Sequence, residues 1–134
     1  MSLASLLAQV MTALQVSGLF QRVWVVQTDI FAADQFTFKV RAVVSTEYTF
    51  QVRIYYNRGH CDYAYQLFRD VPILRWDNKE HFADLPTYPH HYHNEHGLPE
   101  PSPLQGDPEK DLPIVLAQLE QFLARASHPE QEES

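Results

Sequence analysis

Apolar residues recur at helical spacing near both ends of the chain, and each stripe predicts an amphipathic helix. The first helix is expected over residues 2–17, with Ser2 as its N-cap and Gly18 as the left-handed residue that ends it. The second is expected over residues 112–123, with Asp111 as its N-cap. The stripes consist of Leu3, Leu6, Leu7, Val10, Met11 and Leu14 in the first helix and Leu112, Val115, Leu116, Leu119, Phe122 and Leu123 in the second.

Between these helices the apolar period changes to two, which is typical of half-buried antiparallel strands. The clearest alternation puts Phe36 and Phe38 on one face and the polar Thr37 on the other. A short connection before residue 48 predicts a hairpin. The expected strands are residues 23–30, 36–44, 48–56, 62–69 and 73–77.

The order of these elements predicts a single α+β domain over residues 1–126. It begins with the N-terminal helix, which covers one face of an antiparallel sheet of about five strands. A His/Pro-rich loop and the C-terminal helix follow. Residues 127–134 are polar and acidic and are expected to form a disordered tail.

The regular spacing of apolar residues ends after Asp77, where a segment rich in proline and histidine begins. Six prolines fall within residues 85–111, and this density is expected to exclude a central strand or an uninterrupted helix. Five of the seven histidines lie in or near this segment: His81, His90, His91, His93 and His96. Imidazole can both give and take a proton near pH 7, so the segment is expected to carry an acid–base or ligand-binding site. The alternative is a solvated loop whose histidines have no function.

Composition narrows the class of protein. The chain has 134 residues, of which 45% are hydrophobic, and this suits one globular domain. No apolar run approaches the roughly 20 residues of a membrane span, and the N-terminus lacks the basic flank of a signal peptide. The single cysteine, Cys61, excludes an intrachain disulfide and a multi-cysteine zinc site. A cytoplasmic location is therefore expected.

Charge is distributed unevenly along the chain. The formal net charge is -7, but residues 22–79 carry +2 and residues 80–134 carry -9. Net charge bears on solubility and association rather than on fold, so neither a polyanion nor a basic partner is excluded.

One chemistry that suits the histidines is cleavage of RNA without a metal. The 2′-hydroxyl can cut the RNA chain if one group removes its proton and another protonates the departing 5′-oxygen. His81, His91 and His93 are the acid–base candidates. Asp77 is expected to orient one of them through a hydrogen bond. This reaction needs no cofactor and leaves a 2′,3′-cyclic phosphate.

RNA binding also needs cations for the phosphates and flat rings for the bases. Arg41 and Arg53 project from the polar face of the predicted hairpin, and Arg75 immediately precedes the loop. Trp76 and Tyr92 offer rings on which bases could stack. The competing interpretations are a solvated sheet face for the two hairpin arginines and a core position for Trp76.

The second chemistry is a metal site built from the same histidines. His91 and His93 would lie on one side of an extended loop, and imidazole suits zinc. His90 and His96 could complete the ligand set. No HExxH or paired-cysteine pattern supports such a site. The reaction without a cofactor is therefore the leading hypothesis, and a zinc site is the alternative.

A longer motif runs from the last predicted strand through the loop. It consists of Arg75-Trp76-Asp77-Asn78, then His81, then the run LPTYPHHYH that ends at His93, with Glu100-Pro101 and the C-terminal helix beyond it. This order resembles the TumE-like proteins, the toxins of a bacterial and archaeal type II toxin–antitoxin system. The sequence departs from the family pattern at Tyr88, where phenylalanine is usual, at Lys79-Glu80, and at Phe82, where the pattern allows a second histidine.

The resemblance implies an RNA-directed toxin that is neutralised by an antitoxin. The helix–sheet–helix order is also similar to the barnase–RelE-like ribonucleases. The expected partners are therefore RNA and a cognate antitoxin protein, with no membrane, and a homodimer stays open. A third alternative is a non-catalytic interaction module, because proteins that cut RNA are usually more basic than this chain.

Overall fold

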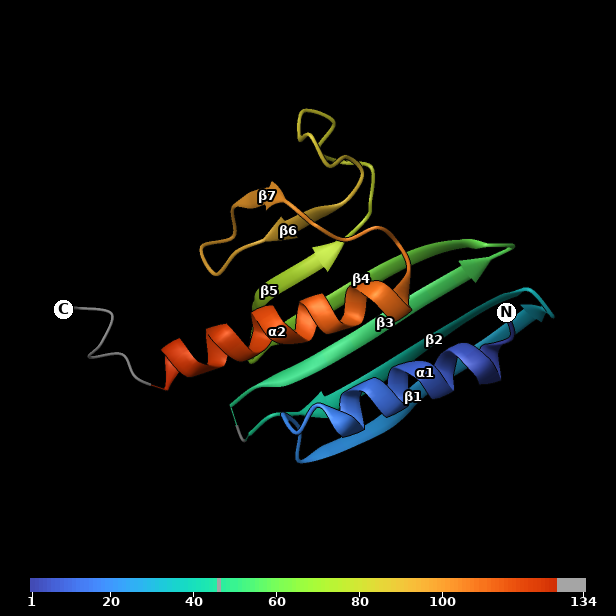
Figure 1. The fold of residues 1–134 in the computed structure, drawn as a ribbon, viewed down its shortest axis with the longest axis horizontal. Coiled ribbons are helices and arrows are strands. Elements are labelled where there is room, and N and C mark those ends of the chain that lie inside the picture. The colour runs from blue at the N-terminus through green and yellow to red at the C-terminus, as the bar shows by residue number, and fades with distance from the viewer. Residues whose placement is uncertain (46, 128–134) are drawn as a thin grey trace.

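The computed structural model describes residues 1–45 and 47–127 and shows a helix, seven antiparallel strands and a second helix (Figure 1). The strands pair in chain order, from β1 at one edge of a single sheet to β7 at the other. The elements are α1 (Leu3–Val16), β1 (Arg22–Ala32), β2 (Gln35–Val43), β3 (Thr49–Asn57), β4 (His60–Phe68), β5 (Pro72–Asp77), β6 (His91–His93), β7 (Pro99–Pro101) and α2 (Pro108–Ala126). The predicted α+β class is confirmed. Residues 128–134 of the predicted tail lie outside the described residues.

Helix α1 begins and ends as the sequence predicts. The hydroxyl of Ser2 accepts a hydrogen bond from the N–H of Ser5 at 3.1 Å. Gly18 follows the helix with a φ of 74°, a backbone conformation that favours glycine. The apolar stripe faces the sheet, because its central members are buried: Leu6, Val10 and Leu14.

Helix α2 begins one turn earlier than predicted. Its N-cap is Asp107, whose carboxylate accepts from the N–H of Glu109, and Pro108 occupies the first turn. Proline suits this position because its missing N–H would have no partner there. Asp111, predicted as the N-cap, is instead a buried residue inside the helix.

Strands β6 and β7 correct the prediction for the proline-rich segment, since the five predicted strands correspond to β1–β5. The three residues of β6 include no proline, so this strand can pair on both sides, with β5 and with β7. Pro99 and Pro101 lie on β7, an edge strand, where a missing N–H leaves no ladder partner unsatisfied. The many prolines of this segment therefore keep β6 and β7 short but do not prevent them from forming.

Both helices pack on the same face of the sheet (Figure 1). Helix α1 lies against β1 and β2, and α2 lies beside α1 in front of β4 (Figure 1). Helix α2 therefore shares the covering role that the sequence assigned to the first helix alone. The largest side chains buried on this face are Trp76, Tyr65, Phe36, Phe38 and Phe50. We call the other side, which carries no helix, the open face. Among residues 1–45 and 47–127, no helix is long and apolar enough to cross a membrane.

Candidate active site on the open face

Strand pairing arranges side chains of β2–β6, all of them polar except Ala64, in two neighbouring rows on the open face. The first row consists of Arg41, Gln51, Gln66, Arg75 and His93. The second consists of Lys39, Arg53, Ala64, Asp77 and His91. Because adjacent strands lie about 4.8 Å apart, each row spans about 19 Å. Six of the predicted site residues therefore share one face of the sheet.

Asp77 and His91 form a buried pair at the β6 end of the second row. The Nε2 atom of His91 lies 2.9 Å from Oδ1 of Asp77, and Nδ1 of His91 lies 3.1 Å from the carbonyl oxygen of Pro89. Each ring nitrogen of His91 therefore has a contact with an oxygen atom, and the two contacts together fix the orientation of the imidazole. Since His91 is 1% exposed, it cannot touch a substrate in this structure. Its geometry suits a positioning group rather than the predicted acid or base.

Arg75 connects this pair to the neighbouring strand. Its Nε donates to Oδ2 of Asp77 at 2.7 Å, and Nη1 donates to Oε1 of Gln66 at 2.6 Å. A guanidinium has five N–H donors, and these contacts leave others to bind an anion. The side chain is partly exposed, in contrast to Asp77. Asp77 therefore orients both Arg75 and His91, which agrees with its predicted role but extends it to the arginine.

His93 is the half-buried histidine of the site. Its ring lies 4.9 Å from that of His91 and 5.5 Å from that of Phe82, between ring centroids. Burial lowers the pKa of His93, and the nearby positive charges of His91, Arg75 and His81 lower it further, against the opposing effect of Asp77. A lowered pKa keeps the imidazole neutral near pH 7, the state in which it can accept a proton.

The other predicted histidines lie apart from the buried pair. His81 is exposed in the loop that leaves the C-terminal end of β5. His90 turns away to Tyr63, whose hydroxyl lies 2.8 Å from its Nδ1. Burial raises the pKa of Tyr63 and lowers that of His90, so the phenol donates this hydrogen bond. His96 is exposed in the turn between β6 and β7.

Trp76 and Tyr92 are on the wrong face for the predicted stacking on RNA bases. Trp76 is 0% exposed, and its Nε1 donates to Oε1 of Gln118 in α2 at 2.7 Å. Tyr92 pairs with it across the strands, with ring centroids 5.0 Å apart. Side chains alternate along a strand, so the neighbours Arg75 and Asp77 face the other way. Trp76 is a core residue, as the competing interpretation held.

Arg41 and Arg53 lie on the open face, as predicted. Nε of Arg41 donates to Oε1 of Gln51 at 3.0 Å. Arg53 is exposed and lines a polar pocket of about 390 Å³ together with Tyr55, Asp62 and Lys79. The backbone N–H of Lys79 also donates to Asp77, so this pocket adjoins the buried pair.

The sequence did not predict the roles of two residues of the site, Phe82 and Asn78. The Phe82 ring packs edge-on against His91 at 4.7 Å and so covers the pair from the loop side. Asn78 ties the loop to β4, because its side chain accepts from the N–H of Tyr63 and donates to the carbonyl of Cys61. The family pattern gave a hint for Phe82, since this residue stands beside His81 where the pattern allows a second histidine. No local sequence pattern shows whether Asn78 caps a turn or bonds to a distant strand such as β4.

A metal could be held by one group of side chains among the described residues. The donor atoms of Asp77, His91 and His93 lie within 4.8 Å of one another. The structure does not bring together the predicted set of four histidines. His90 faces Tyr63, and His96 lies in an exposed turn, whereas the carboxylate of Asp77 joins the group.

Comparisons with known proteins identify the family. No curated protein and no solved structure matches the chain. The family model described as Toxin TumE matches residues 12–123, which include all seven strands completely together with every residue of the site. Helices α1 and α2 are covered in part. Such a toxin implies a cognate antitoxin as partner. The chain belongs to the TumE toxin family.

Proposed function

We propose that this toxin cleaves RNA by transesterification at the His93 end of the two rows. The observation that supports the proposal is the alignment of Arg75 with His93 across β5 and β6, next to the buried Asp77–His91 pair. A neutral imidazole beside a guanidinium combines a base with an anion-binding group, as phosphodiester cleavage requires.

In the proposed reaction, His93 accepts the proton of the 2′-hydroxyl. The O2′–P bond then forms and the P–O5′ bond breaks, while His81 donates a proton to the departing 5′-oxygen. Arg75 stabilises the charge on the non-bridging oxygens of the phosphate. Asp77 and His91 do not touch the substrate but fix the positions of Arg75 and His93. The products are a 2′,3′-cyclic phosphate and a 5′-hydroxyl.

The RNA strand is proposed to extend from this point across the open face. Arg41 and Arg53 stand three and two strands away from β5, on the same face, and Lys79 joins Arg53 at the polar pocket. Cations placed in this way bind phosphates without regard to base sequence. Their alignment supports a single-stranded substrate that lies across the strands.

The experiment incubates the purified protein with an RNA oligonucleotide in excess EDTA and identifies the product ends by mass spectrometry. A matched oligonucleotide with 2′-deoxyribose throughout serves as control. We expect cleavage of the RNA alone, with 2′,3′-cyclic phosphate ends. Ends that carry a 3′-hydroxyl, or loss of activity in EDTA, would contradict the mechanism. Absence of any RNA cleavage and of growth arrest in a bacterial host would favour the non-catalytic interaction module.

A metal centre is the second candidate, and the close approach of the donor atoms of Asp77, His91 and His93 favours it. Carboxylate and imidazole groups suit zinc. The direct bonds of Asp77 to Arg75 and His91 favour the first candidate, because they already satisfy the carboxylate. One equivalent of zinc that survives dialysis, with a weaker signal in His93→Gln, would support the metal centre.

A further inference from the structure

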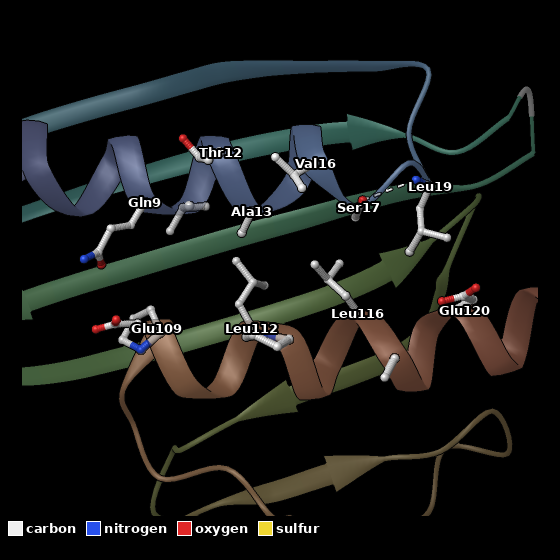
Figure 2. A pocket seen from close by; sticks show the side chains of 14 residues that line it. Gln9, Thr12, Ala13, Val16, Ser17, Leu19, Glu109, Leu112, Leu116 and Glu120 are labelled. Atoms are coloured by element: carbon white, nitrogen blue, oxygen red, sulfur yellow. Dashed lines mark hydrogen bonds between the residues drawn. The ribbon is translucent and has the colours of Figure 1, made fainter.

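A groove runs between the two helices, on the side of the molecule opposite to the open face (Figure 2). The groove has a volume of about 600 Å³. Its floor is apolar, with Val10 and Ala13 from α1 and Leu112 and Leu116 from α2. Val16 stands at its edge with 77% of its surface exposed. An apolar groove between helices is the kind of surface that binds an amphipathic helix of a partner.

The dimensions of the groove set the length of that helix. It follows α1 from Gln9 to Ser17 and α2 from Pro108 to Glu120, and the two helices run in the same direction (Figure 2). At 1.5 Å per residue, these stretches are about 12 Å and about 18 Å long. Two to three turns of a third helix therefore fit, with apolar anchors at positions i, i+4 and i+7.

The charge of the groove specifies the chemistry of its occupant. Glu109 and Glu120 lie at opposite ends, and no lysine or arginine is among the lining residues. Helix α1 has no basic residue in its last turn, so the negative end of its dipole, near Leu19, adds to the acidic character at the Glu120 end. Lysine or arginine at both ends of the bound helix would complement this pattern.

Charge also argues against two other occupants of the groove, a second copy of this chain and the C-terminal end of the chain itself. Two copies of this chain joined groove to groove would bring four glutamates together, and the chain already carries a net charge of -7. Residues 128–134 include three glutamates, so the C-terminal end of the chain does not match an acidic groove either. A separate basic partner fits better than either.

We propose that the α1–α2 groove binds an amphipathic helix of the cognate antitoxin. That helix carries apolar anchors on one face and lysine or arginine residues about eleven positions apart, which matches the separation of Glu109 and Glu120 along α2. The proposal does not depend on RNA cleavage, because the groove lies on the helix-bearing face and the His93 site on the open face. The groove supplies affinity, and a different antitoxin segment would have to reach the open face to block it.

The test measures the affinity of the toxin for its antitoxin by calorimetry. The groove variants are Val16→Glu, Ala117→Glu and Glu120→Lys, and their matched controls are Gln15→Glu, Ala124→Glu and Gln121→Lys. All six positions are exposed, so the fold is preserved. We expect each groove variant to weaken binding about tenfold or more, and each control to change it less than about twofold.

A charge exchange makes the test specific. In this exchange, the basic antitoxin residue that faces Glu120 is replaced by glutamate. The change should weaken binding to the native toxin and restore binding to the Glu120→Lys variant. Groove variants that bind the antitoxin as tightly as the native chain would overturn the proposal. A change in the mass of the toxin alone, measured by analytical ultracentrifugation, with unchanged antitoxin affinity, would assign the groove to a second copy and also overturn it. Cleavage assays on the same variants keep this result separate from the function of the open face.

Discussion

The Nε2 atom of His91 lies 2.9 Å from Oδ1 of Asp77, and both side chains are almost completely buried. Asp77 also accepts from Nε of Arg75 at 2.7 Å and from the N–H of Lys79 at 3.0 Å. One carboxylate thus joins β5, β6 and the start of the loop. Because a buried charge is stable only with such partners, the network serves the fold as well as the site.

Asp77→Asn should therefore destabilise the protein. The substitution keeps the shape of the side chain but removes the negative charge that faces Arg75 and His91. Breaking a buried ion pair from one side costs about 3 kcal/mol or more. Urea unfolding followed by circular dichroism would measure the loss. Asp84→Asn, at an exposed loop position, is the control and should change stability by less than about 0.5 kcal/mol. Equal stability of both variants would show that the network contributes nothing.

His93→Gln should slow RNA cleavage strongly without unfolding the protein. Glutamine keeps a polar group of similar size but cannot accept a proton at neutral pH, and loss of a general base lowers the rate about 10²-fold to 10⁴-fold. The catalytic rate constant, measured with a fluorogenic RNA, should fall while the unfolding midpoint stays within the range of surface substitutions. His96→Gln in the exposed β6–β7 turn should leave the rate unchanged. Retained activity in His93→Gln would remove this residue from the mechanism.

The periodic parts of the fold could be predicted from the sequence because their environment is uniform. Residues 36–44 and 48–56 alternate between a covered and an open face, so their pattern directly gives the side on which Arg41 and Arg53 lie. The core position of Tyr63 and Tyr65, on a face with Leu67, follows from the same alternation.

The candidate site was harder to predict because it depends on contacts between distant segments. Alternation along 75–77 placed Arg75 and Asp77 on one face, but only the pairing of β5 with β6 shows that His91 and His93 meet them there. A three-residue strand is too short to have a recognisable period. His90 and His91 are neighbours with opposite directions, so a histidine-rich sequence alone could not tell which ring joins the site.

Arg53→Ala and Lys79→Ala should weaken RNA binding more than they slow the reaction. Each is expected to remove about one phosphate contact at the polar pocket, which for a single strand reduces the slope of log Kd against log salt by about 0.7. Fluorescence anisotropy with a non-cleavable 2′-methoxy RNA at several salt concentrations measures this slope. Lys110→Ala, on the exposed side of α2, is the control because it removes the same kind of charge elsewhere. An unchanged slope in the two pocket variants would exclude RNA from the pocket.

Cys61 should make the protein less stable as pH rises from 9 to 10. Burial raises the pKa of this thiol from 9.0 to about 12, with a further increase from Asp62. In this interval the unfolded chain loses the thiol proton and the folded chain keeps it, so unfolding becomes more favourable. The expected loss is about 1 kcal/mol. Cys61→Ala should remove this part of the pH dependence in urea titrations, and equal slopes for both proteins would contradict the prediction.

Asp111→Asn should destabilise the start of α2 far more than the same substitution at Asp107. The carboxylate of Asp111 is 1% exposed and accepts from the N–H groups of Gln105, Gly106 and Asp107 at 2.7–3.1 Å. An asparagine amide offers one oxygen there and turns its NH₂ group toward other donors, which costs about 2 kcal/mol or more. Asparagine is as good an N-cap as aspartate, so Asp107→Asn should change stability by only a few tenths of a kcal/mol, roughly. Urea unfolding gives both values, and amide hydrogen exchange at Gln105 and Gly106 should accelerate only in Asp111→Asn. Equal effects of the two substitutions would mean that the buried carboxylate is no more important than the cap.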